Sequence, residues 1–254
     1  MGDIYTVVIA IMATSIRWGC VLAVLPFVSA RDFPLQARLM MALLGGVVFY
    51  PFALSFAEAA PSAATLIYGI LAELIMGGAL ALLVVMGFSI LVIAGEVISI
   101  LSGLSFALLI DPSGQENQTA FTKMLNLFGL AIFIESQGLG HLLQLVGKSY
   151  QTGAVGFMLS PQRIEMLLTG FSEFLMQALF LALPFIGIFL LANFTLGFLA
   201  RTVPQINQIV VGLPGSILLL LMMFIFCFSY VESEITQQHM MLFSKLTDFV
   251  AAKP

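Results

Sequence analysis

An almost continuously apolar run covers residues 66–110 and reads LIYGILAELIMGGALALLVVMGFSILVIAGEVISILSGLSFALLI. A helix needs about 20 apolar residues to cross a bilayer, and this run of 45 residues is too long for one ordinary span. We therefore predict that it either folds back as two helices or forms one very long helix. If the run bends, Gly87 or Gly95 is the expected place.

The composition is that of an integral membrane protein. Hydrophobic residues make up 61% of the 254 residues and charged residues only 9%, whereas soluble domains average roughly 45–50% and 25%. The net charge of −4 argues against a nucleic-acid partner, which requires basic patches. We predict an all-α, polytopic helical membrane protein with kinked helical hairpins, in a single domain over residues 1–254.

Other apolar runs predict further helices at residues 4–28, 35–56, 163–200 and 205–230, and residues 120–146 form a further hydrophobic region that several polar residues interrupt. Proline is expected to kink or interrupt three of them, at Pro51, Pro184 and Pro214. The segments between them contain two predicted loops, at residues 111–119 and 147–161. The domain thus divides into N-terminal helices, C-terminal helices and a tail, at residues 1–110, 122–230 and 231–254.

The tail carries an apolar seam at alternating spacings of four and three, formed by Ile235, His239, Leu242, Leu246 and Phe249. This spacing places the five side chains on one face of a helix. We predict an amphipathic helix that lies on a membrane surface or packs on a partner.

Four ionisable side chains lie inside apolar runs, namely Arg17, Glu73, Glu96 and Glu135. A charged group at the centre of a bilayer costs roughly 2.5–3.5 kcal/mol, so it is kept where it has a partner, a cavity or a function. The natural partners of Arg17 are Glu73 and Glu96, because removing one member of a buried pair strands the other. We expect a structural ion pair; the alternative is that these residues line a hydrated path.

Small residues recur every four positions at Gly95, Ser99, Gly103 and Ala107. On a helix this spacing makes a flat ridge that lets another helix backbone approach closely. Glycine and alanine are also common in membrane helices without such a role. We predict close packing along this ridge, within the chain or against a partner.

A polar and proline-broken zone interrupts the apolar sequence toward the C-terminus, at Pro184, Asn193, Arg201, Pro204, Gln205, Asn207 and Pro214. Such interruptions occur at membrane depth only where protein or a water-filled cavity satisfies the freed backbone groups. Discontinuous helices of transporters bind substrates in this way. A loop outside the membrane would explain the same composition, and both interpretations remain open.

Enzymatic function is not predicted. An intramembrane aspartyl protease needs two aspartates within its spans, but the aspartates of this chain fall at ends or in loops. His141 and His239 lack the His-Glu-x-x-His context of a zinc protease. Cys20 and Cys227 sit in apolar runs and are expected to behave as small hydrophobic residues. The sequence indicates no catalytic, cofactor-binding or metal-binding residue.

Three stretches occur in an ordered series along the chain. The first extends from Ala94-Gly95-Glu96 through Gly103 to Asp111-Pro112, and the second from Phe133 to Ser149. The third contains Pro184, Asn193, Arg201, Pro204-Gln205-Ile206-Asn207 and Val211-Gly212-Leu213-Pro214. In the order, spacing and length of these stretches the chain resembles the FliR/SctT family of type III secretion export-gate proteins, and the flagellar branch more closely than the virulence branch.

This resemblance implies a single-copy subunit of the flagellar export gate in the bacterial inner membrane, at the basal body. Together with FliP-like and FliQ-like subunits it would form a closed channel for unfolded flagellar substrates. An FlhB-like subunit and membrane lipid are the other expected partners. The helices would pack largely against neighbouring subunits of this hetero-oligomeric gate.

The family also implies a plug across the closed channel, which corresponds here to residues 106–121. The residues expected in this gate loop are Phe106, Leu108, Leu109, Ile110, Asp111, Pro112 and Phe121. Apolar side chains can close a pore by dewetting. Without the resemblance, the composition of this segment favours an ordinary solvent loop.

A secondary transporter or channel for a small solute is the alternative function. In that case Arg17, Glu73 and Glu96 would form the path of the ion or substrate. A structural assembly factor is a third hypothesis.

Overall fold

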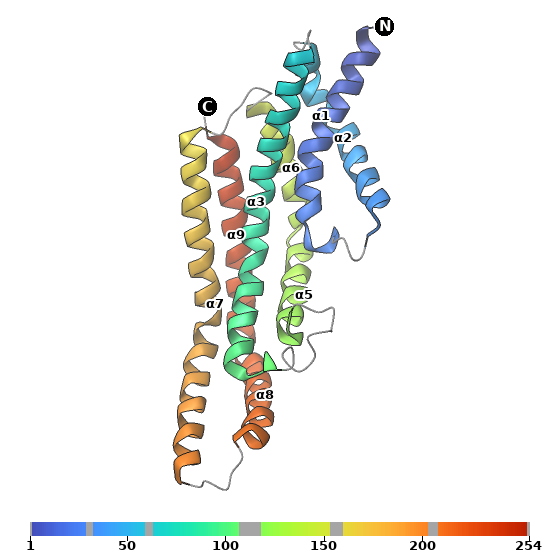
Figure 1. The fold of residues 1–254 in the computed structure, drawn as a ribbon. Helices are drawn as coiled ribbons and strands as arrows, with labels where there is room; N and C mark the ends of the chain where they lie inside the picture. Colours follow the sequence, from blue (N-terminus) through green and yellow to red (C-terminus); the bar gives the residue numbers. More distant parts are fainter. Residues whose placement is uncertain are drawn as a thin grey trace. The chain divides into compact units, whose positions relative to one another are not determined.

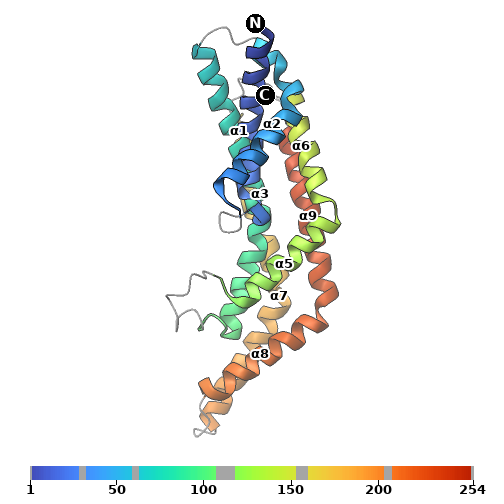
Figure 2. The same ribbon diagram turned by 90° about the vertical axis from the view of Figure 1, so that its right-hand side faces the viewer.

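The computed structural model describes residues 2–28, 33–58, 63–106, 118–152, 160–202 and 208–252, and within these ranges the regular structure is entirely helical (Figures 1 and 2). The elements are α1 (Gly2–Val24), the 3-10 helix η1 (Pro26–Val28), α2 (Leu35–Glu58), α3 (Ala63–Ser102), α5 (Ala120–Glu135), α6 (Gly138–Thr152), α7 (Pro161–Thr202), α8 (Gln208–Phe226) and α9 (Phe228–Ala251). In this part of the chain, four helices are long and apolar enough to cross a membrane, or up to five if a bent pair counts as one span. The prediction of an all-α polytopic membrane protein is confirmed.

The long apolar run forms one helix. α3 comprises 40 residues and continues through both Gly87 and Gly95, so at about 1.5 Å per residue it is about 60 Å long. A Cβ at position 87 would lie 2.8 Å from the Cδ2 atom of Leu242, so this leucine side chain packs directly on Gly87. Of the two predicted forms, the single long helix is therefore the observed one.

The structure divides the apolar region over residues 120–146 into two helices, α5 and α6. The break lies at Gln137, which adopts a left-handed conformation with φ 55°. The backbone N–H of Ser136 closes α5 by donating to the carbonyl groups of Ile132 and Ile134. The predicted loop at 147–161 is partly wrong, because α6 continues to Thr152.

Proline does not end the helices that contain it. Pro51 lies inside α2, Pro184 inside the 42-residue α7 and Pro214 inside α8. A proline removes one backbone donor and crowds the preceding turn, and in membrane helices neighbouring groups commonly compensate. Pro51 was predicted to end or kink its helix, and the structure shows that it does not end it.

The predicted span over residues 205–230 ends earlier, at Phe226, and α9 begins at Phe228. The two helices are bent by 68° at Cys227. The tail is helical as predicted, but its seam is turned inward: all five seam side chains are buried in the chain itself, namely Ile235, His239, Leu242, Leu246 and Phe249. The predicted membrane-surface or partner contact is therefore not made by this seam.

The described helices form two compact units. Unit 1 contains residues 1–87, 137–172 and 240–254, and unit 2 contains residues 88–136 and 173–239. Within unit 1, α1 and α2 form an antiparallel hairpin (Figures 1 and 2). The core of unit 2 is built from α3, α5, α7, α8 and α9, with Leu91, Phe121, Phe185, Phe189 and Ile235 among its buried residues.

Candidate functional site

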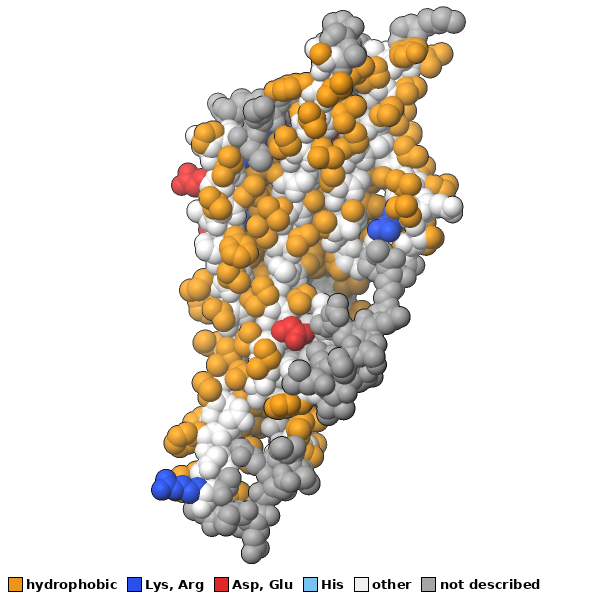
Figure 3. Space-filling model, viewed as in Figure 1, with side chains coloured by type: hydrophobic (Ala, Val, Ile, Leu, Met, Phe, Trp, Pro, Cys, Tyr) orange, Lys and Arg blue, Asp and Glu red, His pale blue; other side chains and the backbone are white. Residues whose placement is uncertain are grey.

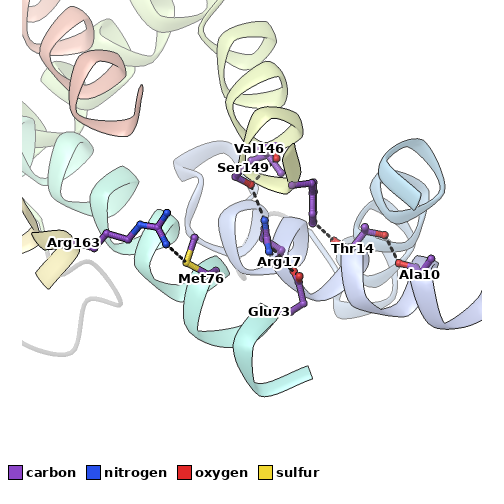
Figure 4. Close-up of polar contacts among 9 residues, drawn as sticks. Ala10, Thr14, Arg17, Glu73, Met76, Val146, Ser149 and Arg163 are labelled. Carbon is purple, nitrogen blue, oxygen red and sulfur yellow. Dashed lines mark hydrogen bonds and ion pairs between the residues drawn. The ribbon is translucent and has the colours of Figure 1, made fainter. Parts of the chain in front are cut away.

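Arg17 on α1 forms a buried, two-pronged ion pair with Glu73 on α3 (Figure 4). Its Nε atom donates to Glu73 Oε2 and its Nη2 atom to Glu73 Oε1, both at 2.7 Å. Each of the two side chains is only 1% exposed. Parallel N–H···O bonds of this kind are among the strongest hydrogen bonds in proteins. The pair therefore joins the first and third helices of the chain in the interior of unit 1.

Helix α6 completes the surroundings of the guanidinium. Arg17 Nη1 donates to Ser149 Oγ at 3.0 Å, and Ser149 in turn donates to the carbonyl group of Val146 at 2.6 Å (Figure 4). The Tyr150 ring lies under the guanidinium, with its centroid 4.1 Å from Cζ. The Tyr150 hydroxyl donates to the Thr14 carbonyl at 3.1 Å. One arginine thus links α1, α3 and α6.

Small residues allow the helices to approach this closely. A Cβ at Gly77 of α3 would lie 2.9 Å from the Arg17 Cα atom, so α1 and α3 are in backbone contact beside the ion pair. On the other side of α1, Thr14 Oγ1 lies 3.0 Å from the carbonyl oxygen of Gly46 on α2. A Cβ at Gly46 would lie 2.8 Å from the carbonyl oxygen of Ile11. The sequence therefore places glycine where α1 meets both neighbours.

This cluster is suited to holding helices together. Both carboxylate oxygens of Glu73 are used by Arg17, and neither charged group reaches solvent. Burial raises the pKa of the Tyr150 phenol, since a phenolate would be desolvated there, so the ring under the guanidinium stays neutral. Tyr150 belongs to α6, outside the candidate spans. A hydrated ion path would need exposed or unsatisfied charged groups, which this cluster does not present.

Arg163, near the start of α7, is a second fully buried arginine that the sequence analysis did not select (Figure 4). Its Nη2 atom donates to the carbonyl group of Ala252, at the end of α9, at 2.8 Å. Its Nη1 atom lies 3.7 Å from the sulfur of Met76, and Cζ lies 5.7 Å from the centroid of the Phe249 ring. A cation at a helix C-terminus is favourable because the last carbonyl groups carry negative partial charge.

The ridge of small residues packs against the start of α5. A Cβ at Gly95 would lie 2.9 Å from the Thr122 Cα atom, and Ser99 Oγ lies 2.6 Å from Thr119 Oγ1. Gly103 follows the end of α3 in a left-handed conformation, with φ 80°, which glycine adopts without steric cost. Ala107 lies outside the described residues. The close contact is therefore made within the chain.

Replacing Gly95 by alanine is expected to lower the free energy of unfolding by about 1–3 kcal/mol, because the added methyl group meets backbone that cannot rotate away. Gly78 provides a matched control on the same helix, since a Cβ there has no neighbour within 4 Å. Gly78→Ala is expected to be neutral or slightly stabilising, as alanine is the better helix former. Thermal midpoints in detergent measure both effects, and equal midpoints for the two variants would contradict the packing assigned to Gly95.

Glu96 does not pair with Arg17. Its Oε1 atom accepts a hydrogen bond from the backbone N–H of Thr119 at 3.3 Å, within unit 2. The Thr119 side chain also accepts from the N–H of Thr122 and so caps α5. Thr119 is thus tied to α3 through both Glu96 and Ser99, near the end of the segment 106–121 that is predicted as the gate loop. The fourth ionisable candidate, Glu135, is exposed at the end of α5.

The predicted gate loop is described only at its two ends. Phe106 is 56% exposed, whereas Phe121 is buried in the core of unit 2 and contacts the Phe185 and Phe224 rings at centroid distances of 6.4 and 5.9 Å. Residues 107–117 lie outside the described residues, and with them the predicted gate residues Leu108, Leu109, Ile110, Asp111 and Pro112. Phe121 occupies an anchoring position at the end of the loop.

The polar C-terminal zone is spread over α7 and α8. Asn193 Nδ2 donates to the Leu101 carbonyl at 3.2 Å, which links α7 to the end of α3. Arg201 is exposed in the last turn of α7. Gly212 is buried and Pro214 exposed in α8. Pro204, Gln205 and Asn207 lie outside the described residues. Within the described part of the chain, no three His, Cys, Asp or Glu side chains are grouped to hold a metal ion.

Most of the chain is similar to known proteins. The family model described as bacterial export proteins, family 1, matches residues 8–241. The flagellar biosynthetic protein FliR of Escherichia coli (strain K12) is 25% identical over 196 residues, which cover 74% of this chain and 72% of that protein.

Two further relatives are a SpaR protein and another FliR protein. The surface presentation of antigens protein SpaR of Shigella flexneri is 30% identical over 129 residues, covering 51% of this chain and 50% of that protein. The flagellar biosynthetic protein FliR of Aquifex aeolicus (strain VF5) is 30% identical over 158 residues, covering 59% and 60%. The matched part is thus about half the length of the Shigella relative.

Proposed function

This chain belongs to the bacterial export proteins of family 1, and from this membership we propose that it is the FliR-like subunit of a flagellar type III export gate. The family match over residues 8–241 carries the proposal, because it includes nearly every described helix. The relatives are named flagellar biosynthetic protein FliR and surface presentation of antigens protein SpaR, and the family description, bacterial export proteins, supports a role in export.

We propose that FliP-like and FliQ-like subunits surround this chain in the bacterial inner membrane at the flagellar basal body, with an FlhB-like subunit nearby. The surface supports such partners. Hydrophobic side chains cover much of the face seen in Figure 3. On α7 the exposed ones include Leu183, Leu190, Leu191, Phe194 and Phe198. Apolar surface of this extent is stable only against lipid or other helices.

In this proposal the loop between Phe106 and Phe121 helps to close the channel. The described contacts support a firm attachment of its far end, where Thr119 bonds to Glu96 and Ser99 and Phe121 enters the core. A closing segment needs rigid supports, since a seal fails when its ends shift. The chain itself would perform no covalent chemistry, and unfolded flagellar proteins would be the transported substrates.

The transporter hypothesis gains no support from the contacts. It requires Arg17, Glu73 and Glu96 to form one path, but Arg17 and Glu73 satisfy each other and Glu96 bonds to Thr119. A tightly paired arginine and glutamate, each 1% exposed, offer no open site for an ion or a solute. We therefore retain the export gate as the proposed function.

Co-purification tests this proposal. The tagged chain, expressed with the neighbouring genes of its operon and solubilised in mild detergent, is expected to recover FliP-like and FliQ-like subunits in a fixed, unequal ratio. The masses of the intact complexes, measured by native mass spectrometry, give that ratio directly. Recovery of the chain alone or as a homodimer would argue against the gate and would favour a self-sufficient transporter.

A further inference from the structure

A cavity of about 430 Å³ lies between α1 and α2, within unit 1. α1 contributes residues 15–23 of its C-terminal part, and α2 contributes residues of its first turns, between Leu35 and Leu43. Eight residue steps of helix correspond to about 12 Å, so the cavity extends roughly that far along the hairpin. Gly19 and Ala42 also line it, and a Cβ at Gly19 would lie 3.4 Å from the Ala42 Cβ atom.

The lining is apolar apart from very few groups. Its apolar lining residues include Ile16, Leu22, Leu39 and Leu43. Ser15 also lines the cavity, but its hydroxyl already donates to the Ile11 carbonyl at 2.6 Å. The lining contains no acidic side chain. Arg38 is the one charged side chain in this lining, so a charged ligand group would interact with it.

Arg38 is placed to bind an anion. Its Nε atom is buried and has no hydrogen-bond partner, and no ion pair joins its side chain to another described residue. It lies in the first turn of α2, where the helix contains no acidic residue and where the helix dipole also favours negative charge. Because a buried atom is closed to a ligand, a bound anion would meet the terminal Nη1 and Nη2 atoms of the guanidinium, which are not among the buried side-chain atoms that lack a partner.

The position of Arg38 in the hairpin indicates which anion fits. The candidate spans are Ile4–Val24 and Leu35–Leu54, so Arg38 lies about one helical turn inside the end of the second span. Phosphate groups of lipids occupy this depth, and basic pockets between membrane helices bind anionic head groups. The apolar wall continues from Arg38 toward the middle of both spans, where an acyl chain would lie.

We propose that this cavity binds a phospholipid with an anionic head group, its phosphate on Arg38 and one acyl chain along the apolar wall. The site is independent of the export function and requires only that the hairpin lie in a bilayer. An acidic segment of a partner protein would match the charge of Arg38. It would leave the apolar depth of the cavity unfilled, and the lipid is therefore the assigned occupant.

The fluorescence of Trp18, the single tryptophan of the chain, provides the test. Trp18 precedes Gly19 of the cavity wall, so quenching by lipids with brominated acyl chains reports a chain bound there. The full chain is reconstituted in phosphatidylcholine nanodiscs that contain increasing fractions of brominated phosphatidylglycerol or brominated phosphatidylcholine. Quenching is expected at lower fractions of the anionic lipid, with a preference of about fivefold.

Arg38→Gln is expected to reduce this preference to near one. Arg201→Gln removes the same charge from an exposed position on α7 and is expected to leave the preference unchanged. Equal thermal midpoints in phosphatidylcholine nanodiscs establish that both variants are folded. Equal quenching by the two lipids in the unaltered chain, as an acidic protein segment would predict, overturns the proposal. A preference that persists in Arg38→Gln overturns it as well.

Discussion

Replacing Glu73 by leucine is expected to lower the free energy of unfolding by about 3–5 kcal/mol, the cost of leaving a buried charge without its partner. Arg17 would keep its hydrogen bond to Ser149 and its contact with the Tyr150 ring, but its charge would have no counterion among the described side chains. The thermal midpoint of the purified chain and its amount in the membrane measure the effect.

A rescue variant separates charge from packing. Arg17→Met combined with Glu73→Leu replaces both charges by apolar groups of similar size and is expected to recover most of the lost stability, because such replacements of buried pairs are often neutral. Glu135→Gln serves as the control, since Glu135 is an exposed carboxylate at the end of α5. A double variant no more stable than Glu73→Leu would show that the pair does not act as a unit.

The apolar pattern predicted most helices of this fold but few of their boundaries. The lengths of the apolar runs predicted the helices α1, α2, α3 and α7. The pattern could not show the break at Gln137, where a left-handed residue divides two apolar helices without a proline or a long polar segment. It also predicted the seam of α9 without showing that the chain itself covers that seam, because periodicity identifies a buried face and not what buries it.

The sequence predicted one half of the candidate site but not its partner residue. The cost of a charge in an apolar run selected Arg17 and predicted a partner. The sequence did not show whether Glu73 or Glu96 pairs with Arg17. The structure shows it, because α1 contacts α3 at Gly77, one helical turn from Glu73. Arg163 was missed because it begins a helix, a position usual for exposed residues. Its burial depends on the end of α9, which lies far away in the sequence.

Deleting residues 109–115 from the gate loop is expected to open the assembled export gate to small ions. These residues include the apolar pair Leu109-Ile110 and the dipeptide Asp111-Pro112. Apolar segments close pores by excluding water, so their removal is expected to leave a hydrated path. The flanking anchors at Glu96, Thr119 and Phe121 remain, and the deletion is expected to spare assembly.

A deletion of the same length at residues 153–159, between α6 and α7, is the matched control. It leaves only Ser160 between Thr152 of α6 and Pro161 of α7, in a connection to which no closing function is assigned. Both deletions are compared in the complex with its partner subunits, and the same protein is also reconstituted alone. Co-purification of partners at unchanged ratio shows that each shortened chain still assembles.

Conductance across a planar bilayer is the most direct test of the closed-gate account. The unaltered assembly is expected to pass no current, the 109–115 deletion to show stepwise openings, and the 153–159 deletion to stay silent. The chain reconstituted without partners is expected to be silent in every form. A 109–115 deletion that leaves the assembly closed, or a current carried by the chain alone, would contradict the account.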